Sequence, residues 1–322
     1  MIQRIGIIGG GAWGTALALV AARAGRHVIV YAREPATVAA INQQRAAPSH
    51  MGVEANIAGT HAIADACVAD MVIIAVPAQE FRVAAAEAAP FIEANIPVVI
   101  AAKGIEQATG RRLSEVLGEV APAVEVAVLS GPSFAADVAK GLPTAVTLAT
   151  AKMDIALELS RALAGPSFRP YAETDIVGVE LGGALKNVLA IAAGIVAGRG
   201  LGASASAALI ARGFAEIRRF AEANGAKAET LMGLSGLGDV VLTCSTAQSR
   251  NFSVGLALGA GRPIPNLLAE GVATAEIAHR LAEERGISMP VTAAVAAVLG
   301  GVLTVDEVVE QLMSRPIRRE SD

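Results

Sequence analysis

The segment Gly182–Asn187 carries the side chain whose setting most clearly suggests chemistry. It reads Gly-Gly-Ala-Leu-Lys-Asn, and Glu180 and Lys186 are the only ionisable residues between positions 176 and 198. In a helix, the two glycines four and three positions before Lys186 would leave open space on the turn that its side chain covers. Because burying an unpaired ammonium is costly, this lysine must be paired, reach solvent or act on a ligand. The segment alone leaves structural and functional roles balanced.

A glycine-rich turn near the N-terminus has the sequence and setting of a dinucleotide site. Gly9, Gly11 and Gly14 follow a β-rich run over 5–8 and precede a helical stretch over 15–24, which matches G-x-G-x-x-G in its required context. The first glycine permits the tight turn, the second lets a pyrophosphate approach the backbone, and the third lets helix and strand pack closely. The helix N-terminus would supply N–H groups to the phosphates. Helix–strand packing alone is the structural alternative.

A second β-rich run, 27–31, completes a βαβ unit and ends where such folds bind the ribose. Arg33 follows this run and predicts accommodation of the 2′-phosphate of NADP(H), whereas a carboxylate would bind the 2′-hydroxyl of NAD(H). Glu34 keeps the use of NAD(H) open. Arg33 could instead stack on the adenine or lie in solvent.

Further candidates follow the ends of other expected strands. Continuous apolar runs over 70–76 and 97–101 are typical of parallel strands covered on both faces, and the second leads into Lys103. A run over 124–129 leads into the turn 131–133, whose serine is expected to cap a helix. Open α/β sheets bind ligands at the carboxyl ends of their strands. Lys103 and this turn are therefore candidate anion contacts, with a surface lysine and simple capping as the alternatives.

The second half of the chain reads as helices. Helical periodicity predicts helices over 181–196, 204–224, 228–232, 253–258, 274–285 and 291–299, after strand-like runs over 144–149 and 167–171. The change of pattern near Ile176 predicts a first domain over 1–176 and a second over 177–322.

Polar residues interrupt these expected helices at three places. Asp239 ends a glycine-rich stretch, and Arg250 stands between Ser249 and Asn251 before a helix. A guanidinium with short polar neighbours at a helix N-terminus suits a phosphate, and a helix cap is the structural alternative. Glu270 lies at a turn, where its carboxylate could hold a ribose or an amide, or only face solvent.

Composition narrows the class of protein. The 322 residues are 53% hydrophobic, enough for about two domains with buried cores, and the net charge of −4 argues against a nucleic-acid or anionic-membrane surface. Cys67 and Cys244 are too few for a disulfide framework or a metal site and fit a reducing compartment. The N-terminus lacks a signal-peptide pattern, and the longest apolar runs are short for membrane spans. We expect a cytoplasmic protein with no nucleic-acid partner, no integral membrane segment and no metal.

The order of these motifs resembles the NAD(P)-dependent glycerol-3-phosphate dehydrogenase family of bacteria along nearly the whole chain. Segment 183–194 is similar to that family's signature, as are segments 9–14, 103–104, 131–135, 236–239 and 249–251 to its other motifs. The resemblance implies an α/β protein with an N-terminal Rossmann-type doubly wound sheet. It also implies an all-α C-terminal substrate domain, as in 6-phosphogluconate dehydrogenase, and a site in the cleft between the domains.

A reaction and a set of roles come with this resemblance. It implies NAD(P)H-dependent reduction of dihydroxyacetone phosphate to sn-glycerol 3-phosphate for phospholipid synthesis, with NADP(H) favoured by Arg33 and NAD(H) left open, and it suggests a homodimer. The general acid/base would be Lys186. The residues implied around the substrate are Lys103, Gly131, Ser133, Lys186, Asp239, Ser249, Arg250 and Asn251. Those implied at the cofactor are Gly9, Gly11, Ala12, Trp13, Gly14, Arg33, Lys103, Ala135, Arg250, Leu268 and Glu270.

The implied chemistry matches what these residues can do. Reduction of a ketone requires a proton for the developing alkoxide, which a positioned ammonium such as that of Lys186 can supply. Lys103 is the charged group expected to lower the pKa of Lys186, and Asp239 is the one expected to orient its side chain.

Two departures from the family pattern stand out. Ala12 replaces a frequent serine, and segment 49–53 reads Ser-His-Met-Gly-Val where an aromatic-Leu-Pro-Gly sequence is usual, so no cofactor contact is assigned there.

Two other functions remain open at this point. A β-hydroxyacid or ketopantoate reductase could share the same two-domain architecture, but the segment 249–251 together with Asp239 favours a small phosphorylated polyol. A nucleotide-sensing protein without turnover would keep the glycine turn 9–14 and would need neither Lys186 nor Arg250.

Overall fold

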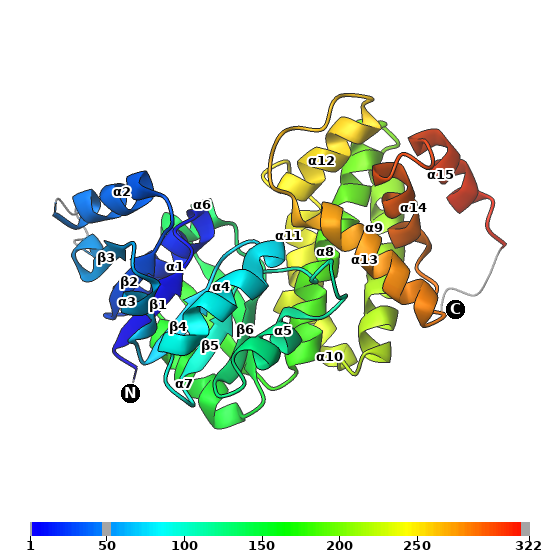
Figure 1. Ribbon diagram of the computed structural model, residues 1–322. Helices are drawn as coiled ribbons and strands as arrows, with labels where there is room; N and C mark the ends of the chain where they lie inside the picture. The colour runs from blue at the N-terminus through cyan, green and yellow to red at the C-terminus, as the bar shows by residue number, and fades with distance from the viewer. Residues whose placement is uncertain (1, 47–52, 317–322) are drawn as a thin grey trace. The chain divides into compact units, whose positions relative to one another are not determined.

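The computed structural model describes residues 2–46 and 53–316 (Figure 1). Positions 49–52 of the departing segment lie outside the described residues. The chain divides into two compact units, the first comprising 1–183 and 221–239 and the second 184–220 and 240–322. Helix α8 (Ile176–Gly198) begins at the residue where we placed the domain boundary, and the units divide within this helix. The boundary at 176 stays a prediction.

An eight-stranded sheet organises the first unit, with strand order β3-β2-β1-β4-β5-β6-β7-β8. The strands are β1 (Arg4–Ile8), β2 (His27–Tyr31), β3 (Ile57–Thr60), β4 (Met71–Ile74), β5 (Pro97–Ile100), β6 (Glu125–Ser130), β7 (Thr144–Thr150) and β8 (Phe168–Glu173). Neighbouring strands are parallel except for β6 and β7. The first six strands follow the Rossmann order 3-2-1-4-5-6. The predicted doubly wound sheet is confirmed.

Helices cover both faces of this sheet, as the continuous apolar strands predicted (Figure 1). One core cluster joins the sheet to α1 (Ala12–Arg23) and α7 (Met153–Leu163), and the other joins it to α4 (Phe81–Ala88) and α5 (Leu113–Val120). Both clusters contain fully buried residues of β4 and β5. The carboxyl ends of these strands are therefore held rigidly where polar residues follow them.

Short helices complete the first unit. They are α2 (Pro35–Ala46), α3 (Ile63–Cys67), α6 (Ala135–Ala139) and α10 (Ala228–Leu231), with 3-10 turns at Val53–Asn56, Ala78–Glu80 and Ala89–Phe91 and a π-helical turn at Leu234–Gly238. The prediction that Ser133 caps a helix is wrong. Phe134 holds the N-cap position of α6, because the turn continues one residue further, and the Ser133 hydroxyl donates instead to the Gly131 carbonyl at 2.9 Å.

The described residues of the second unit form helices and their connections. The helices are the rest of α8, α9 (Ala203–Ala223), α11 (Asp239–Thr243), α12 (Arg250–Gly259), α13 (Glu270–Glu284), α14 (Pro290–Leu299) and α15 (Val305–Met313), with α9 and α11 beginning or ending across the division. Helix α12 begins at Arg250, three residues earlier than predicted, because the Ser249 hydroxyl caps it by accepting from the Phe252 N–H. Helix α15 was not predicted, although Thr304 and Glu307 form a capping box at its start.

The length and hydropathy of α8 would suffice for a membrane span, yet 89% of its apolar 18-residue stretch is buried inside the protein. This burial is that of a core helix.

In the second unit, α8 and α12 approach each other through glycines on both helices. A Cβ at Gly255 would lie 1.9 Å from the Ile191 carbonyl oxygen, and one at Gly194 would lie 2.2 Å from that of Phe252. Only glycine allows these two backbones to approach so closely.

We expect Gly255→Ala to lower the free energy of unfolding by roughly 1–3 kcal/mol, because the added methyl group must push two backbones apart. The matched control is Gly118→Ala on α5, where nothing lies within 4 Å of the added Cβ. That change should raise stability by up to about 1 kcal/mol, since alanine is the better helix former. Urea unfolding followed by circular dichroism measures both. Equal effects would show that the α8–α12 approach does not depend on glycine.

A buried carboxylate caps α14 from a neighbouring helix. Glu216 of α9 is 3% exposed and accepts hydrogen bonds from the backbone N–H groups of Val291 at 2.7 Å and Thr292 at 3.1 Å. Burial raises the pKa of Glu216 to about 7, and the hydrogen bonds from Val291 and Thr292 oppose that rise. The folded protein therefore holds a proton on Glu216 at pH values where the unfolded chain has released it.

Stability should accordingly fall as pH rises from 5 to 8. Glu216 favours the folded state fully below its unfolded pKa, and this contribution is lost as pH rises through the folded pKa near 7. Relative to Glu216→Gln, which cannot ionise, the wild type should lose on the order of 3 kcal/mol over this range. Urea titrations at several pH values test this, with the exposed Glu222→Gln as control. A constant difference between wild type and Glu216→Gln would contradict it.

Candidate active site

The glycine turn of the first unit has the backbone geometry that its sequence predicts. Gly9 has a φ of +116°, and a Cβ there would lie 2.6 Å from the Ala75 carbonyl oxygen. A Cβ at Gly14 would lie 1.9 Å from the Gly9 carbonyl oxygen, so Gly14 lets α1 pack on the turn. Gly11 has open space at its Cβ position and holds the N-cap of α1 without a side-chain hydrogen bond. The first N–H groups of α1 are thus accessible to an anion.

A pocket of about 450 Å³ opens at this turn. Its wall includes Gly9, Gly11 and Arg33 of the predicted cofactor residues, together with Glu34 and residues of the segment 75–87. An exposed glycine backbone at a helix N-terminus beside an arginine fits a dinucleotide phosphate group. The residues present therefore suit the nicotinamide cofactor that the turn predicts.

The other predicted cofactor residues of this unit are not among those that line the pocket. Ala12 is the first, exposed residue of α1, and Trp13 donates its indole N–H to the Ala101 carbonyl at 3.2 Å. Ala135 is the first residue of α6. Their contacts with a cofactor stay predictions.

Arg33 forms an exposed ion pair with Glu80 at 2.5 Å, and its side chain is 71% exposed. Exposed pairs contribute little to stability, because both partners are well hydrated and lose side-chain freedom. A phosphate group could therefore take the guanidinium from Glu80 at small cost. Glu34 lines the same pocket, so Arg33 and Glu34 both remain candidates for binding the ribose of the cofactor.

Four predicted substrate residues of the first unit come together around one ammonium. Lys103 donates to the Gly131 carbonyl at 2.8 Å and to the Asp239 carboxylate at 2.7 Å. Ser133 donates to the same Gly131 carbonyl. The Lys103 side chain is 15% exposed and that of Asp239 is 1% exposed. This arrangement confines a nearly buried cation with a carboxylate beside it, a pairing that the sequence did not predict.

Gly131 itself adopts a φ of +140°, and a Cβ there would lie 2.9 Å from the Val146 Cα. Both facts favour glycine at this position. The carbonyl that receives Lys103 thus depends on a backbone conformation that other residues rarely adopt.

The expected open space beside Gly182 and Gly183 is wrong. A Cβ at Gly182 would lie 2.8 Å from the Ser235 carbonyl oxygen, and one at Gly183 would lie 2.4 Å from the Ser130 hydroxyl oxygen. The glycines let other parts of the first unit approach α8 closely. The Ser130 hydroxyl is buried and has no hydrogen-bond partner among the described residues.

Glu180, the other ionisable residue of α8, has a structural role. Its carboxylate accepts hydrogen bonds from the backbone N–H and the hydroxyl of Ser114 at 2.8 and 2.6 Å, which caps α5. Burial raises the pKa of Glu180 above its usual range, and the bonds from Ser114 oppose the shift. Glu180 therefore joins α8 to α5.

In the second unit, Lys186 is 7% exposed and donates to the hydroxyl of Thr243 at 2.9 Å. Thr243 was not predicted as a site residue. It lies four positions after Asp239, so both residues occupy neighbouring positions on one side of α11. Helical spacing from the predicted carboxylate is the signal that could have identified it. The Lys186 side chain is thus buried and does not extend into solvent.

Next to Lys186, two asparagines connect three helices. Asn251 of α12 donates its amide N–H to the Asn187 side-chain oxygen at 2.9 Å and accepts from the Gly271 N–H of α13 at 2.9 Å. A Cβ at Gly271 would lie 2.6 Å from the Asn187 carbonyl oxygen. Asn251, a predicted substrate residue, therefore fixes α8, α12 and α13 around the turn that carries Lys186.

The remaining predicted residues of the second unit lie at helix starts. Ser249 is the buried cap of α12, and Arg250 is its exposed first residue. Among the residues described, Arg250 forms no ion pair, so its guanidinium is available to a phosphate. Glu270 begins α13, and Leu268 is 50% exposed just before it. Their contacts with substrate and cofactor stay predictions.

Within residues 2–46 and 53–316, no group of three or more His, Cys, Asp or Glu side chains could hold a metal ion. Both cysteines are buried free thiols.

Comparison with known proteins places the chain in a family. The profile of the NAD-dependent glycerol-3-phosphate dehydrogenase N-terminus matches residues 4–156, and that of the C-terminus matches residues 175–310. Glycerol-3-phosphate dehydrogenase (NAD(P)+) of a Bradyrhizobium species is 56% identical over 99% of this chain and 98% of its own. That of Brucella ovis is 53% identical over 99% and 100%.

Among solved structures, glycerol-3-phosphate dehydrogenase of Coxiella burnetii is 36% identical over 98% of this chain and 99% of its own, with a TM-score of 0.88. Sequence, fold and the pocket at the glycine turn agree with these matches. The chain therefore belongs to the NAD-dependent glycerol-3-phosphate dehydrogenase family, whose coenzyme is NAD(P).

Proposed function

We propose that the chain reduces dihydroxyacetone phosphate to sn-glycerol 3-phosphate with NADPH or NADH, and that Lys186 is the general acid. The observation that carries this proposal is the buried ammonium of Lys186, held by the Thr243 hydroxyl. A buried lysine in so apolar a helix is a functional candidate when it lies in a dehydrogenase. Sn-glycerol 3-phosphate is a phospholipid precursor, so we assign the enzyme a role in phospholipid synthesis.

The bound cofactor would supply a hydride to the ketone carbon, and the chain's residues must manage charge and protons. An ammonium at Lys186 can stabilise the developing alkoxide and donate a proton to it. The hydrogen bond to Thr243 would hold the lysine side chain in place, and the hydrogen bond from Asn251 to Asn187 would hold the backbone beside it.

Substrate binding is assigned to two further groups. The exposed guanidinium of Arg250, at the N-terminus of α12, suits a phosphate through charge-assisted hydrogen bonds and helix N–H groups. Lys103 supplies a second cation, and Asp239 holds it in place. A homodimer and a cytoplasmic location stay predictions from the sequence resemblance.

Lys186→Ala should lower kcat by about 10²–10⁴, the usual contribution of a positioned acid or base. The assay follows loss of nicotinamide absorbance with dihydroxyacetone phosphate. The control is Lys140→Ala, which removes an exposed lysine and should leave kcat unchanged. Circular dichroism would confirm that both variants fold. Normal turnover by folded Lys186→Ala would remove this mechanism.

Arg33→Asp should raise the KM for NADPH far more than that for NADH, because a carboxylate repels the 2′-phosphate and can accept from the 2′-hydroxyl. Initial rates with each coenzyme give the two values. Glu80→Gln frees Arg33 from its ion pair and should lower the KM for NADPH. Equal changes for both coenzymes in Arg33→Asp would show that Arg33 does not contact the 2′-phosphate.

A further inference from the structure

The segment that carries Lys103 has little regular structure of its own. It links β5 to α5 over residues 101–112, with one isolated bridge between Ile105 and Arg112. Backbone polar groups outside helices and sheets must find other partners. The placement of Lys103 therefore depends on which side chains hold the backbone on either side of it.

Before Lys103, the Ala101 carbonyl accepts from the indole N–H of Trp13. After Lys103, one side chain, Gln79, holds the backbone at two points. Its amide N–H donates to the Ile105 carbonyl at 2.9 Å, and its amide oxygen accepts from the Gln107 N–H at 2.9 Å. The amide thus replaces two backbone hydrogen bonds that a neighbouring strand would have made.

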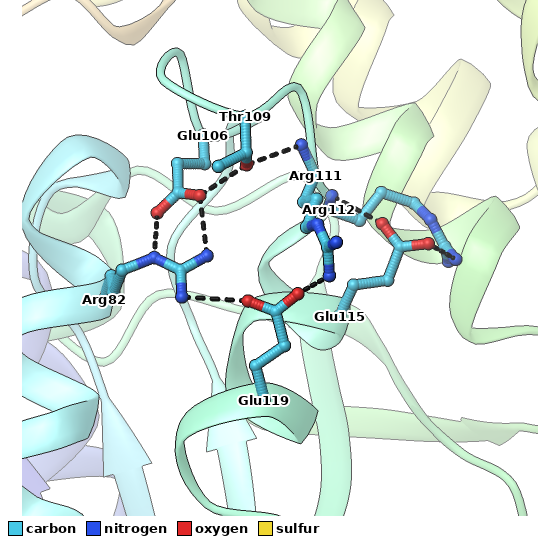
Figure 2. A network of polar contacts seen from close by, with 7 residues as sticks. All are labelled: Arg82, Glu106, Thr109, Arg111, Arg112, Glu115 and Glu119. Atoms are coloured by element: carbon cyan, nitrogen blue, oxygen red, sulfur yellow. Dashed lines mark hydrogen bonds and ion pairs between the residues drawn. The ribbon is translucent and has the colours of Figure 1, made fainter.

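Between these two points, Glu106 turns towards Arg82 of α4. The guanidinium binds both carboxylate oxygens, at 2.8 and 2.9 Å, and Thr109 donates to the same carboxylate at 2.5 Å (Figure 2). Glu106 is 7% exposed, and the hydrogen bond from Arg82 holds the pKa of its carboxyl below the usual range. Arg82 also bonds Glu119 of α5 at 2.9 Å, so it ties α4, the segment and α5 together.

This arrangement fixes position more than it adds stability. Glu106 is buried but the Arg82 side chain is 34% exposed, and an ion pair of this kind recovers little beyond the desolvation cost of its charges. A bidentate arginine–carboxylate pair, however, permits one geometry. The outer part of the network in Figure 2 differs. The Arg111 side chain is 52% exposed and pairs with Glu119, while the Arg111 backbone N–H donates to the Thr109 hydroxyl.

The turn Ala78–Glu80 and the helix α4 that follows it, which carry Gln79 and Arg82, also form part of the dinucleotide pocket. Gln79 and its neighbours Glu80 and Val83 line the pocket that contains the glycine turn 9–11. Gln79 and Arg82 therefore lie on an element with the pocket on one side and the Lys103 segment on the other. Neither residue was singled out by sequence, because their partners lie 24 to 28 positions away.

We propose that Gln79 and Arg82 are positioning residues that hold Lys103 in the geometry the reaction requires. The proposal rests on the proposed function for its kinetic consequence and on the contacts of Gln79 and Arg82 for its structural one. A displacement of about 1 Å at a reacting group can cost about 10²-fold in rate. Loss of either residue should therefore lower kcat without removing any group that touches the substrate.

Gln79→Met and Arg82→Met test the kinetic consequence. Each should lower kcat for dihydroxyacetone phosphate reduction by about tenfold to 10²-fold, with a smaller change in the KM for NADPH. The matched control, Arg111→Met, removes an exposed arm of the same network and should leave kcat within about twofold. A loss confined to the KM for NADPH would overturn the proposal, because it would assign Gln79 and Arg82 to the pocket wall alone.

A second measurement follows Lys103 without any substrate. Reductive ¹³C-methylation labels the five lysines of the chain, and Lys103→Arg assigns the Lys103 resonance. In Gln79→Met and Arg82→Met this resonance should move towards those of the exposed Lys140 and Lys152, since the contact with Asp239 loosens. In Arg111→Met it should stay in place.

These two measurements separate the possible failures. If the wild type does not turn over dihydroxyacetone phosphate, the proposed function fails while the resonance still tests the positioning. An unmoved Lys103 resonance in folded variants overturns the proposal, whether or not kcat falls. If the methionine variants do not fold, Gln79→Glu preserves size and the acceptor for Gln107 but loses the donor to Ile105, and the same outcomes apply to it.

Discussion

The ion pair between Lys103 and Asp239 is the interaction on which the first unit's polar site depends. It joins residues 136 positions apart at 2.7 Å, with the carboxylate almost fully buried. A buried ammonium is tolerated only when its donors are satisfied, and the Gly131 carbonyl supplies a further acceptor. The end of β5, the turn after β6 and the start of α11 are thereby held to one another.

Asp239 directly follows a π-helical turn, is the first residue of α11, and donates its backbone N–H to carbonyls of that turn. The preceding π-helical turn, 234–238, contains Gly236, where a Cβ would lie 1.9 Å from the Leu231 carbonyl oxygen. Gly236 therefore allows this turn to pack closely against Leu231, and the turn thereby positions the Asp239 carboxylate.

In the second unit, neutral hydroxyl and amide groups are among the partners of the buried polar side chains. Lys186 bonds a hydroxyl, and the side chains of Asn187 and Asn251 bond each other. Around them, α8 and α12 meet through glycines. Close helix packing leaves little freedom for the backbone that carries Lys186, which is what a proton donor in a fixed geometry requires.

Local sequence signals determined a large part of this structure. The turn with Gly9, the Rossmann strand order and the helical second half follow from patterns that act over a few residues, such as glycine spacing, strand-length apolar runs and helical periodicity. The family resemblance, confirmed by the comparisons, rests on the same short motifs. Sequence also singled out Lys186 as a candidate, because the one cation of a long apolar helix is visible without coordinates.

The tertiary structure decided which groups meet. It showed that neighbouring segments, and not open space, occupy the sites beside Gly182 and Gly183, and that Ser133 bonds a carbonyl and does not cap a helix. It also paired Lys186 with Thr243 and placed Gln79 against the Lys103 segment. Such pairings depend on how connections between distant elements run, and no periodicity within one element encodes the neighbour that another element will bring to it.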